Sequence, residues 1–289
     1  VQEAAAAFGN VEVTTMDAQL DKAKQVQLLE NAITMKPDVI FLDHGTGEAM
    51  VPGVAKAMKA GIKVILFDVV VPGVDATCDI AQDDYMLAYH SLQKLAQDIG
   101  GKGNIVVVST SGSAPIERRK RILPLILDRY PGIKVVAEFG KTGANAVPQT
   151  IEMMDSVMTA HPGKNDIQAI WAPYDQWAIA CLTAVQQRGR EIPIYSIDVS
   201  PYDLELMRKP GSMWKATAAC DPSEIGRVAV RVAELAMTGQ PVPRYVIVPS
   251  ALVTQEAARQ IPAGKFITKD IVSEWGDSGI AWTPELKAM

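Results

Sequence analysis

Hydrophobic and polar positions alternate along this chain in blocks of two kinds. Short, continuously apolar runs such as DVIFLD (38–43), NIVVVST (104–110) and IQAIWAP (167–173) are followed by stretches with helical periodicity such as AKQVQLLENAITM (23–35) and DQWAIACLTAVQQRG (175–189). Strands that are apolar on both faces are typical of parallel sheets covered by helices on both sides. The order of the blocks therefore predicts an α/β fold with right-handed crossovers.

The same pattern predicts the remaining elements. Further strands are expected at VEVTTM (11–16), IKVILFD (62–68), IKVVAEF (133–139) and IPIYSID (192–198). A short extended piece is expected at ATCDIAQ (76–82), and another extended piece at RYVIVPSALVT (244–254). Further helices are expected at 48–61, 84–100, 114–132, 147–163 and 227–239. This run of units is long enough for two sheets, and no long linker separates them.

Two stretches have nearly the same design, GIKVILFDVV (61–70) and EIPIYSIDVS (191–200). Each is an apolar run that ends on an aspartate and then turns. Parallel strands direct their carboxyl ends toward the ligand crevice of an open α/β sheet. Asp68 and Asp198 are therefore predicted to be two carboxylates, one from each half of the molecule, that face one cleft.

Composition narrows the function classes. The 289 residues are 48% hydrophobic and 21% charged with a net charge of −5, which argues against nucleic acid as the main partner. The densest basic run, ERRKR (117–121), is interpreted as a solvated helix face. No apolar stretch approaches the ~18–20 residues of a membrane span. The three cysteines have no metal-binding spacing and are expected to be buried apolar residues.

The sequence contains no GxSxG, HExxH or P-loop motif, so no enzymatic chemistry and no cofactor are predicted. The one partial enzyme motif is HGTGEAM (44–50), with Asp68 at the end of the next strand, as in a dinucleotide-binding fold. Its last position is Met50 rather than Gly or Ala, which would obstruct close packing of helix and strand. A nucleotide-dependent enzyme therefore remains only as an alternative.

Other polar and aromatic residues follow predicted strands or open the helices after them. They are His44, Gln82, Asn145, Tyr174, Asp175 and Trp177. Helix capping is an equally good explanation for Asn145 and Asp175, and core packing for Trp177. Taken together, carboxylates, amides and aromatic faces around one cleft suit a neutral polyhydroxylated ligand.

The combined order of several stretches resembles the periplasmic sugar-binding proteins of bacterial ABC importers, in the group that includes the ribose-binding protein. These stretches include VAKAMKAGIKVILFD, NIVVVSTSGSAPIERRKR, IQAIWAPYDQWAIACLTAVQQRG, IPIYSIDVSP and DPSEIGRVAV. The resemblance implies a type I periplasmic binding protein, with two Rossmann-like lobes joined by three hinge crossovers near 81–83, 219–222 and 250–253. The N-terminal lobe would comprise 1–82 and 221–250, and the C-terminal lobe 83–220 and 251–289.

The resemblance also implies ligand roles at matching positions, which are Asp43, Asp68, Gln82, Asn145, Tyr174, Asp198 and either Cys220 or Asp221. The chain departs from the ribose binders where they carry ligand arginines, because Val69 and Ile116 stand at those positions. Losing two guanidinium groups removes forked donors for sugar oxygens. The expected ligand is therefore another monosaccharide or a sugar alcohol.

The function expected from the resemblance is that of a periplasmic or lipid-anchored extracytoplasmic solute-binding protein. It would be a monomer without a cofactor that closes around its ligand by hinge motion and delivers it to an ABC permease. Residues before Val1, with a signal peptide and a first strand, are expected in the natural protein. The ligand-binding domain of a LacI-type transcriptional regulator, which has the same fold, is the main alternative.

Overall fold

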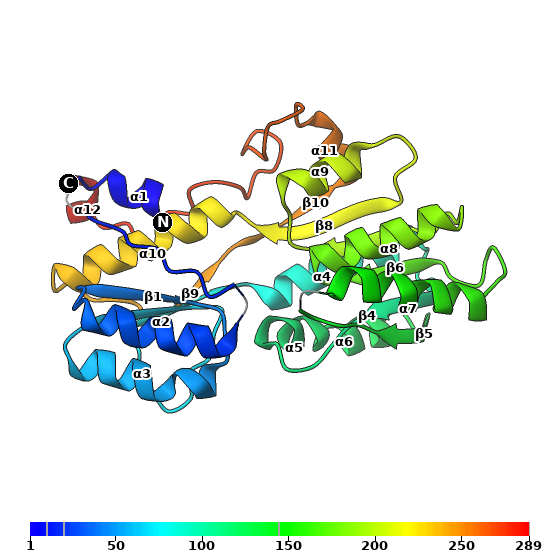
Figure 1. Ribbon diagram of the computed structural model, residues 1–289. Helices are drawn as coiled ribbons and strands as arrows, with labels where there is room; N and C mark the ends of the chain where they lie inside the picture. Colours follow the sequence, from blue (N-terminus) through cyan, green and yellow to red (C-terminus); the bar gives the residue numbers. More distant parts are fainter. Residues whose placement is uncertain (10, 20, 144, 289) are drawn as a thin grey trace. The chain divides into compact units, whose positions relative to one another are not determined.

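The computed structural model describes residues 1–9, 11–19, 21–143 and 145–288, and the chain divides into two units (Figure 1). Unit 1 contains Val1–Gln82, Asp221–Pro249 and Gly276–Met289, and unit 2 contains Asp83–Cys220 and Ser250–Trp275. The chain thus passes between units at 82–83, 220–221 and 249–250, and a fourth time at 275–276, where the sequence had indicated no passage.

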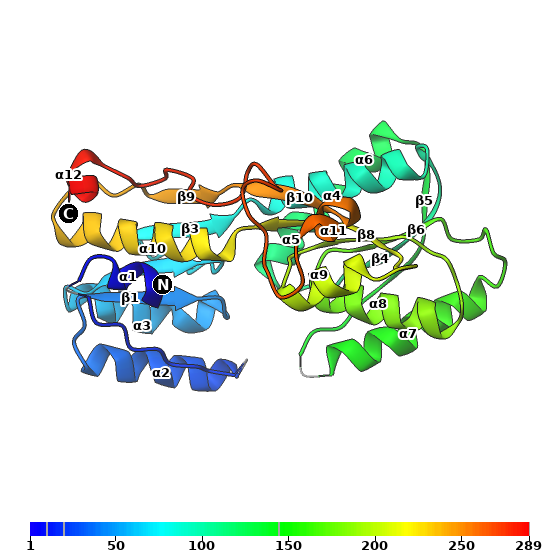
Figure 2. The ribbon, with the colours of Figure 1, turned by 90° about the horizontal axis from the view of Figure 1, so that it is seen from above.

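Unit 1 is built on a four-stranded parallel sheet in the order β1-β2-β3-β9. Its strands are β1 (Val39–Asp43), β2 (Lys63–Phe67), β3 (Cys78–Gln82) and β9 (Tyr245–Val248). Helix α3 packs on β2 and helix α10 packs on β2 and β3, on opposite faces of the sheet, while α2 lies against α3 (Figures 1 and 2). These helices are α2 (Lys22–Thr34), α3 (Gly47–Lys59) and α10 (Pro222–Met237). The α/β prediction is confirmed, since strands buried on both faces are here covered by helices.

The prediction of a strand at VEVTTM (11–16) is wrong. Residues 11–16 form no ladder with any described strand, and β1 pairs with β2 only among the described strands. Five of these six residues are exposed and Val13 is only partly buried, so the segment contributes no apolar face to the core. Alternation of apolar and polar residues stabilises a strand only where one face is covered.

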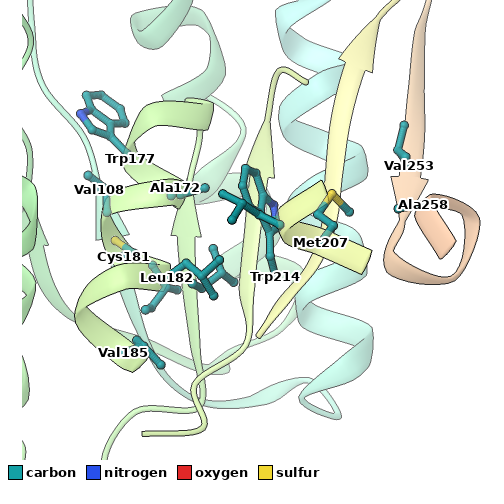
Figure 3. Close-up of a cluster of buried hydrophobic side chains, with 14 of the residues drawn as sticks. Val108, Ala172, Trp177, Cys181, Leu182, Val185, Met207, Trp214, Val253 and Ala258 are labelled. Carbon is teal, nitrogen blue, oxygen red and sulfur yellow. The ribbon is translucent and has the colours of Figure 1, made fainter. Parts of the chain in front are cut away.

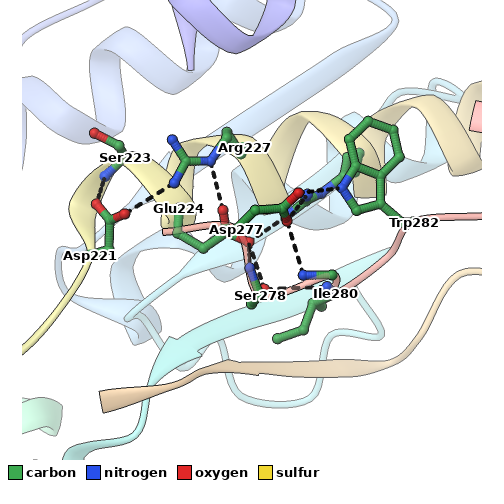
Figure 4. A network of polar contacts seen from close by, with 10 residues as sticks. Asp221, Ser223, Glu224, Arg227, Asp277, Ser278, Ile280 and Trp282 are labelled. Carbon is green, nitrogen blue, oxygen red and sulfur yellow. Dashed lines mark hydrogen bonds and ion pairs between the residues drawn. The ribbon is translucent and has the colours of Figure 1, made fainter. Parts of the chain in front are cut away.

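The C-terminal segment 276–289 belongs to unit 1, not to the second lobe where the sequence analysis placed it. A polar network holds it against α10 (Figure 4). Arg231, which is 2% exposed, donates to Glu224 and to Asp277 at 2.5 and 2.9 Å, and its guanidinium lies 5.0 Å from the ring centroid of Trp282. Glu224 also accepts from the backbone N–H of Ser278 at 2.9 Å. Such long-range ion pairs leave no periodic pattern in a sequence.

Unit 2 is built on a six-stranded sheet in the order β10-β8-β7-β6-β4-β5. Its strands are β4 (Lys102–Val108), β5 (Gly132–Phe139), β6 (Ala169–Ala172), β7 (Ile194–Ile197), β8 (Trp214–Cys220) and β10 (Ser250–Thr254). All pair in parallel except β10, which is antiparallel to β8. The helices are α4 (Asp84–Asp98), α5 (Ala114–Lys120), α6 (Leu123–Arg129), α7 (Ala146–Ala160), α8 (Asp175–Gln187), α9 (Pro201–Arg208) and α11 (Gln255–Gln260).

Proline divides two elements that were predicted to be continuous. The helix predicted at 114–132 is two helices, α5 and α6, and Pro124 lies in the first turn of the second one. The extended piece predicted at 244–254 is two strands in different sheets, β9 and β10, with Pro249 between them. Proline has no N–H to donate and restricts the residue before it, so it favours the start of an element over its interior.

The core of unit 2 lies between its sheet and helices (Figure 3). Trp177 and Trp214 are each 0% exposed there, and the Trp214 indole N–H donates to Ser196 Oγ at 2.7 Å. Cys78, Cys181 and Cys220 are buried, as predicted. Among the residues that the structure describes, no helix combines the length and apolar character needed to cross a membrane.

Candidate functional site

The two motif aspartates have the same backbone geometry. Asp68 follows β2 with φ of +48°, and Asp198 follows β7 with φ of +73°. Each N–H continues the ladder to the next strand, from Asp68 to Ile80 O at 3.1 Å and from Asp198 to Ala218 O at 2.8 Å. A left-handed conformation is uncommon for a residue other than glycine, and such residues concentrate at functional sites. The repeated motif thus gives the same strand-end conformation in both units.

The unit 1 cluster consists of Asp43, His44, Asp68 and Gln82, at the carboxyl ends of three neighbouring strands. Asp68 is 4% exposed, and its carboxylate accepts from the Gln82 side-chain amide at 2.9 Å and from the Gln82 backbone N–H at 3.3 Å. Asp43 and His44 are exposed, and their side chains meet at 2.5 Å. The cluster therefore offers both hydrogen-bond acceptors and donors at one sheet edge.

The glycines of the HGTGEAM loop are explained by packing within unit 1. A Cβ on Gly47 would lie 1.6 Å from the carbonyl oxygen of Val70, and one on Gly45 would lie 2.1 Å from Gln25 Oε1. Met50, at the last motif position, is 0% exposed and belongs to the unit 1 core. The loop therefore holds the start of α3 against the turn that follows Asp68, which removes the main support for a dinucleotide site.

The unit 2 cluster consists of Asp84, Arg119, Tyr174, Asp175 and Asp198. Arg119 is 2% exposed and donates to both carboxylate oxygens of Asp198, at 2.8 and 3.0 Å. It also donates to Asp84 at 2.8 Å and to the carbonyl oxygen of Pro173 at 2.8 Å. Burial alone would lower the pKa of Arg119, but attraction by Asp198 and Asp84 raises it. The Asp198 side chain keeps 25% exposure, so this guanidinium fixes a carboxylate that solvent can still reach.

Arg119 was missed by the sequence analysis, which interpreted the run 117–121 as a solvated face. The structure corrects this, because the buried residues of α5 are Pro115, Ile116 and Arg119. Arg119 follows Ile116 by three residues and Pro115 by four, which is the spacing of one helix face. The positions of these two apolar residues could therefore have indicated that Arg119 lies on the buried face. Asp84 was missed as well, and it is 1% exposed at the start of α4.

Tyr174 and Asp175 stand where α8 begins, beside Asp198. Burial, together with the charges of Asp175 and Asp198, raises the pKa of Tyr174 to about 12, so its hydroxyl stays protonated. Burial, together with Asp198 and Asp203, raises the pKa of Asp175 to about 7. Partial burial and a neighbouring carboxylate each disfavour the charged form of a carboxyl group.

Four further predicted residues have other surroundings. The assignment of Trp177 to the ligand site is corrected, because its ring is fully buried and its N–H donates to Lys141 O at 2.8 Å. Trp177 is therefore a core residue. Asn145 precedes α7 but makes no capping bond with its side chain, which is exposed. Cys220 ends β8 and is 5% exposed. Asp221 caps α10 by accepting from Ser223 N–H at 2.9 Å and pairs with Arg227 at 3.0 Å.

Comparison with known proteins places these features in one family. The family model for the periplasmic binding protein domain matches residues 1–241. A 5-methylthioribose transporter solute-binding protein from Thermotoga lettingae TMO, solved in complex with 5-methylthioribose, is 32% identical. It has a TM-score of 0.88, and the alignment covers 99% of this chain and 90% of that one.

Two curated relatives are similar over shorter regions. A xylitol-binding protein of Mycolicibacterium smegmatis is 28% identical over 65% of this chain and 54% of that protein. A D-apiose import binding protein of Actinobacillus succinogenes is 28% identical over 68% of this chain and 63% of that protein. The chain thus spans between half and two thirds of these relatives. Together with the family model, which matches most of the chain, these similarities show that the chain belongs to the periplasmic binding protein domain family.

Proposed function

We propose that this protein is an extracytoplasmic solute-binding protein that captures a monosaccharide or a sugar alcohol and delivers it to an ABC permease. The observation that carries the proposal is the repeated strand-end aspartate, held in the same left-handed conformation in both units. Both clusters would take part in binding. The same uncommon backbone conformation at two matching aspartates supports a shared role for them.

The chemistry of the clusters supports a neutral polyhydroxylated ligand. Carboxylates accept from sugar hydroxyls, while the amide of Gln82 and the guanidinium of Arg119 fix those carboxylates. Xylitol, D-apiose and 5-methylthioribose, the ligands named for the relatives, are neutral and polyhydroxylated. A buried hydroxyl left without a partner costs about 1–3 kcal/mol, so the set of polar groups would select among epimers.

Thermal unfolding against a panel of pentoses, hexoses and sugar alcohols tests the proposal, with NAD and ATP as controls. A ligand at 100 times its dissociation constant adds about 2.7 kcal/mol to the stability of the folded protein. A shift with one or two sugars or polyols is expected. A shift with a nucleotide and none with any sugar or polyol would refute the proposal.

A further inference from the structure

Asp203, in the first turn of α9, is a buried acid that the proposed function does not use. Its side chain is 0% exposed. One carboxylate oxygen accepts from the backbone N–H of Ser200 at 2.6 Å, and Ser200 Oγ accepts from the Asp203 N–H at 3.3 Å. This capping box satisfies the start of the helix. The other oxygen, Oδ1, is buried and has no hydrogen-bond donor among the described residues.

Besides Ser200, a second side chain within hydrogen-bond reach of Asp203 is another acid, Asp175 of the unit 2 cluster. One oxygen of Asp175 already accepts from the backbone N–H of Gln176 at 2.7 Å. Two ionised carboxylates can only accept hydrogen bonds, so they repel each other at this range. With one proton between them, the same contact becomes a hydrogen bond.

The surrounding charges favour retention of that proton. Asp198, at the end of β7, raises the pKa of both acids in addition to the effect of burial. Arg119 of α5 attracts Asp175, but its donors are occupied by Asp84, Asp198 and the Pro173 carbonyl.

No Lys or Arg side chain of the described residues donates to Asp203 Oδ1 in place of the proton. Helix α9 also packs against α11 and β8, which carry Arg259 and Lys215, and Lys215 donates to Ser212 O at 2.9 Å. No described group of three or more His, Cys, Asp and Glu side chains is arranged to hold a metal ion.

We propose that Asp203 is a positioning residue that holds Asp175 in the unit 2 cluster through one proton shared between their carboxyl groups. The proton ties the start of α8 to the start of α9 and lowers the negative charge next to Asp198. Because Asp175 would contact the ligand under the proposed function, on which this role rests, ligand binding would weaken once the proton is lost at alkaline pH.

Carboxyl carbon NMR on the whole chain, labelled at aspartate Cγ and titrated from pH 4 to 9, tests the shared proton without any ligand. One aspartate is expected to titrate near pH 7, the value expected for Asp175. Asp203→Asn supplies an amide N–H to Asp175 without a proton, so the midpoint of that titration should fall by more than one pH unit. Asp175→Asn should remove the titration altogether.

Asp155→Asn is the matched control. Asp155 is an acid on α7 of the same unit whose side chain is 47% exposed and pairs with Arg188, and its replacement should leave the midpoint unchanged. The proposal is overturned if no aspartate of the wild type titrates above about pH 5.5. It is also overturned if neither Asp203→Asn nor Asp175→Asn alters the titration. Failure of the proposed function would be seen separately, as the absence of any sugar or polyol shift, and would leave this titration in place.

Discussion

The unit 1 and unit 2 clusters present the same motif aspartate by different physical means. In unit 1, the turn after Asp68 is held by close packing of backbone on backbone, where Gly47 meets the Val70 carbonyl, and the Gln82 amide binds the carboxylate. In unit 2, the buried guanidinium of Arg119 donates two hydrogen bonds to Asp198. One sequence motif with one backbone conformation can thus be positioned either by packing or by charge.

The difference has consequences for stability. Close packing depends on shape and is lost when volume is added. A buried ion pair depends on both partners, and removing one leaves the other as an uncompensated charge. We therefore expect added volume to destabilise unit 1 at the turn after Asp68. We expect loss of one member of the buried ion pair to destabilise unit 2.

The largest effect is expected from Arg119→Met, which leaves Asp84 and Asp198 without their shared cation. Removing one partner of a buried pair typically costs about 3–5 kcal/mol, so urea unfolding should show a loss of that size in unit 2. Arg121→Met, on the exposed side just after the same helix, is the control and should change stability by less than about 0.5 kcal/mol. Equal stability of the two variants would mean that charge does not position Asp198.

Alanine at either motif aspartate should weaken ligand binding. Hydrogen bonds to charged groups contribute about 1.5–3 kcal/mol, so Asp68→Ala and Asp198→Ala should each reduce affinity by that amount in calorimetric titration with the sugar or polyol identified by the panel. Asp155→Ala, which alters a half-exposed acid of α7 that pairs with Arg188, should bind like the wild type. Unchanged affinity in both aspartate variants would refute their assignment as ligand residues.

Gly47→Ala probes the packing in unit 1. A Cβ at 1.6 Å from the Val70 carbonyl oxygen cannot be accommodated without displacing the backbone, and overpacking typically costs about 1–3 kcal/mol. Gly53→Ala is the matched control within α3, because its Cβ meets the flexible end of Leu29 at 2.6 Å and alanine favours the helix. If both variants have the same thermal stability, close backbone packing does not hold the turn after Asp68.

A further difference between the units is a pH dependence confined to unit 2. The pKa of Asp175 is raised to about 7, so between about pH 4 and pH 7 the folded chain binds a proton that the unfolded chain releases. The stability that this proton contributes is complete below the unfolded pKa and is lost as the pH rises through about 7. The difference in unfolding free energy between wild type and Asp175→Asn should therefore fall between pH 5 and pH 8. A difference that stays constant with pH would contradict the raised pKa.

Much of the fold could be predicted from the chain because periodicity reports burial directly. Continuously apolar runs such as 104–110 and 167–173 became β4 and β6, and the matched endings at Asp68 and Asp198 became matched left-handed residues. These features follow from local steric preferences and from which faces of an element are covered. The family resemblance was likewise carried by the order of such segments.

Other features were decided by tertiary structure alone. Whether Arg119 lies in solvent or between two acids depends on Asp84 and Asp198, which are 35 and 79 residues away in the sequence. Segment 276–289 joins unit 1 because Glu224 and Arg231 meet Asp277 and Ser278. The free energy of a charge depends on its desolvation and its partners, and both are properties of the folded chain. The sequence determined which residues end the strands, and the tertiary structure decided which charges hold them.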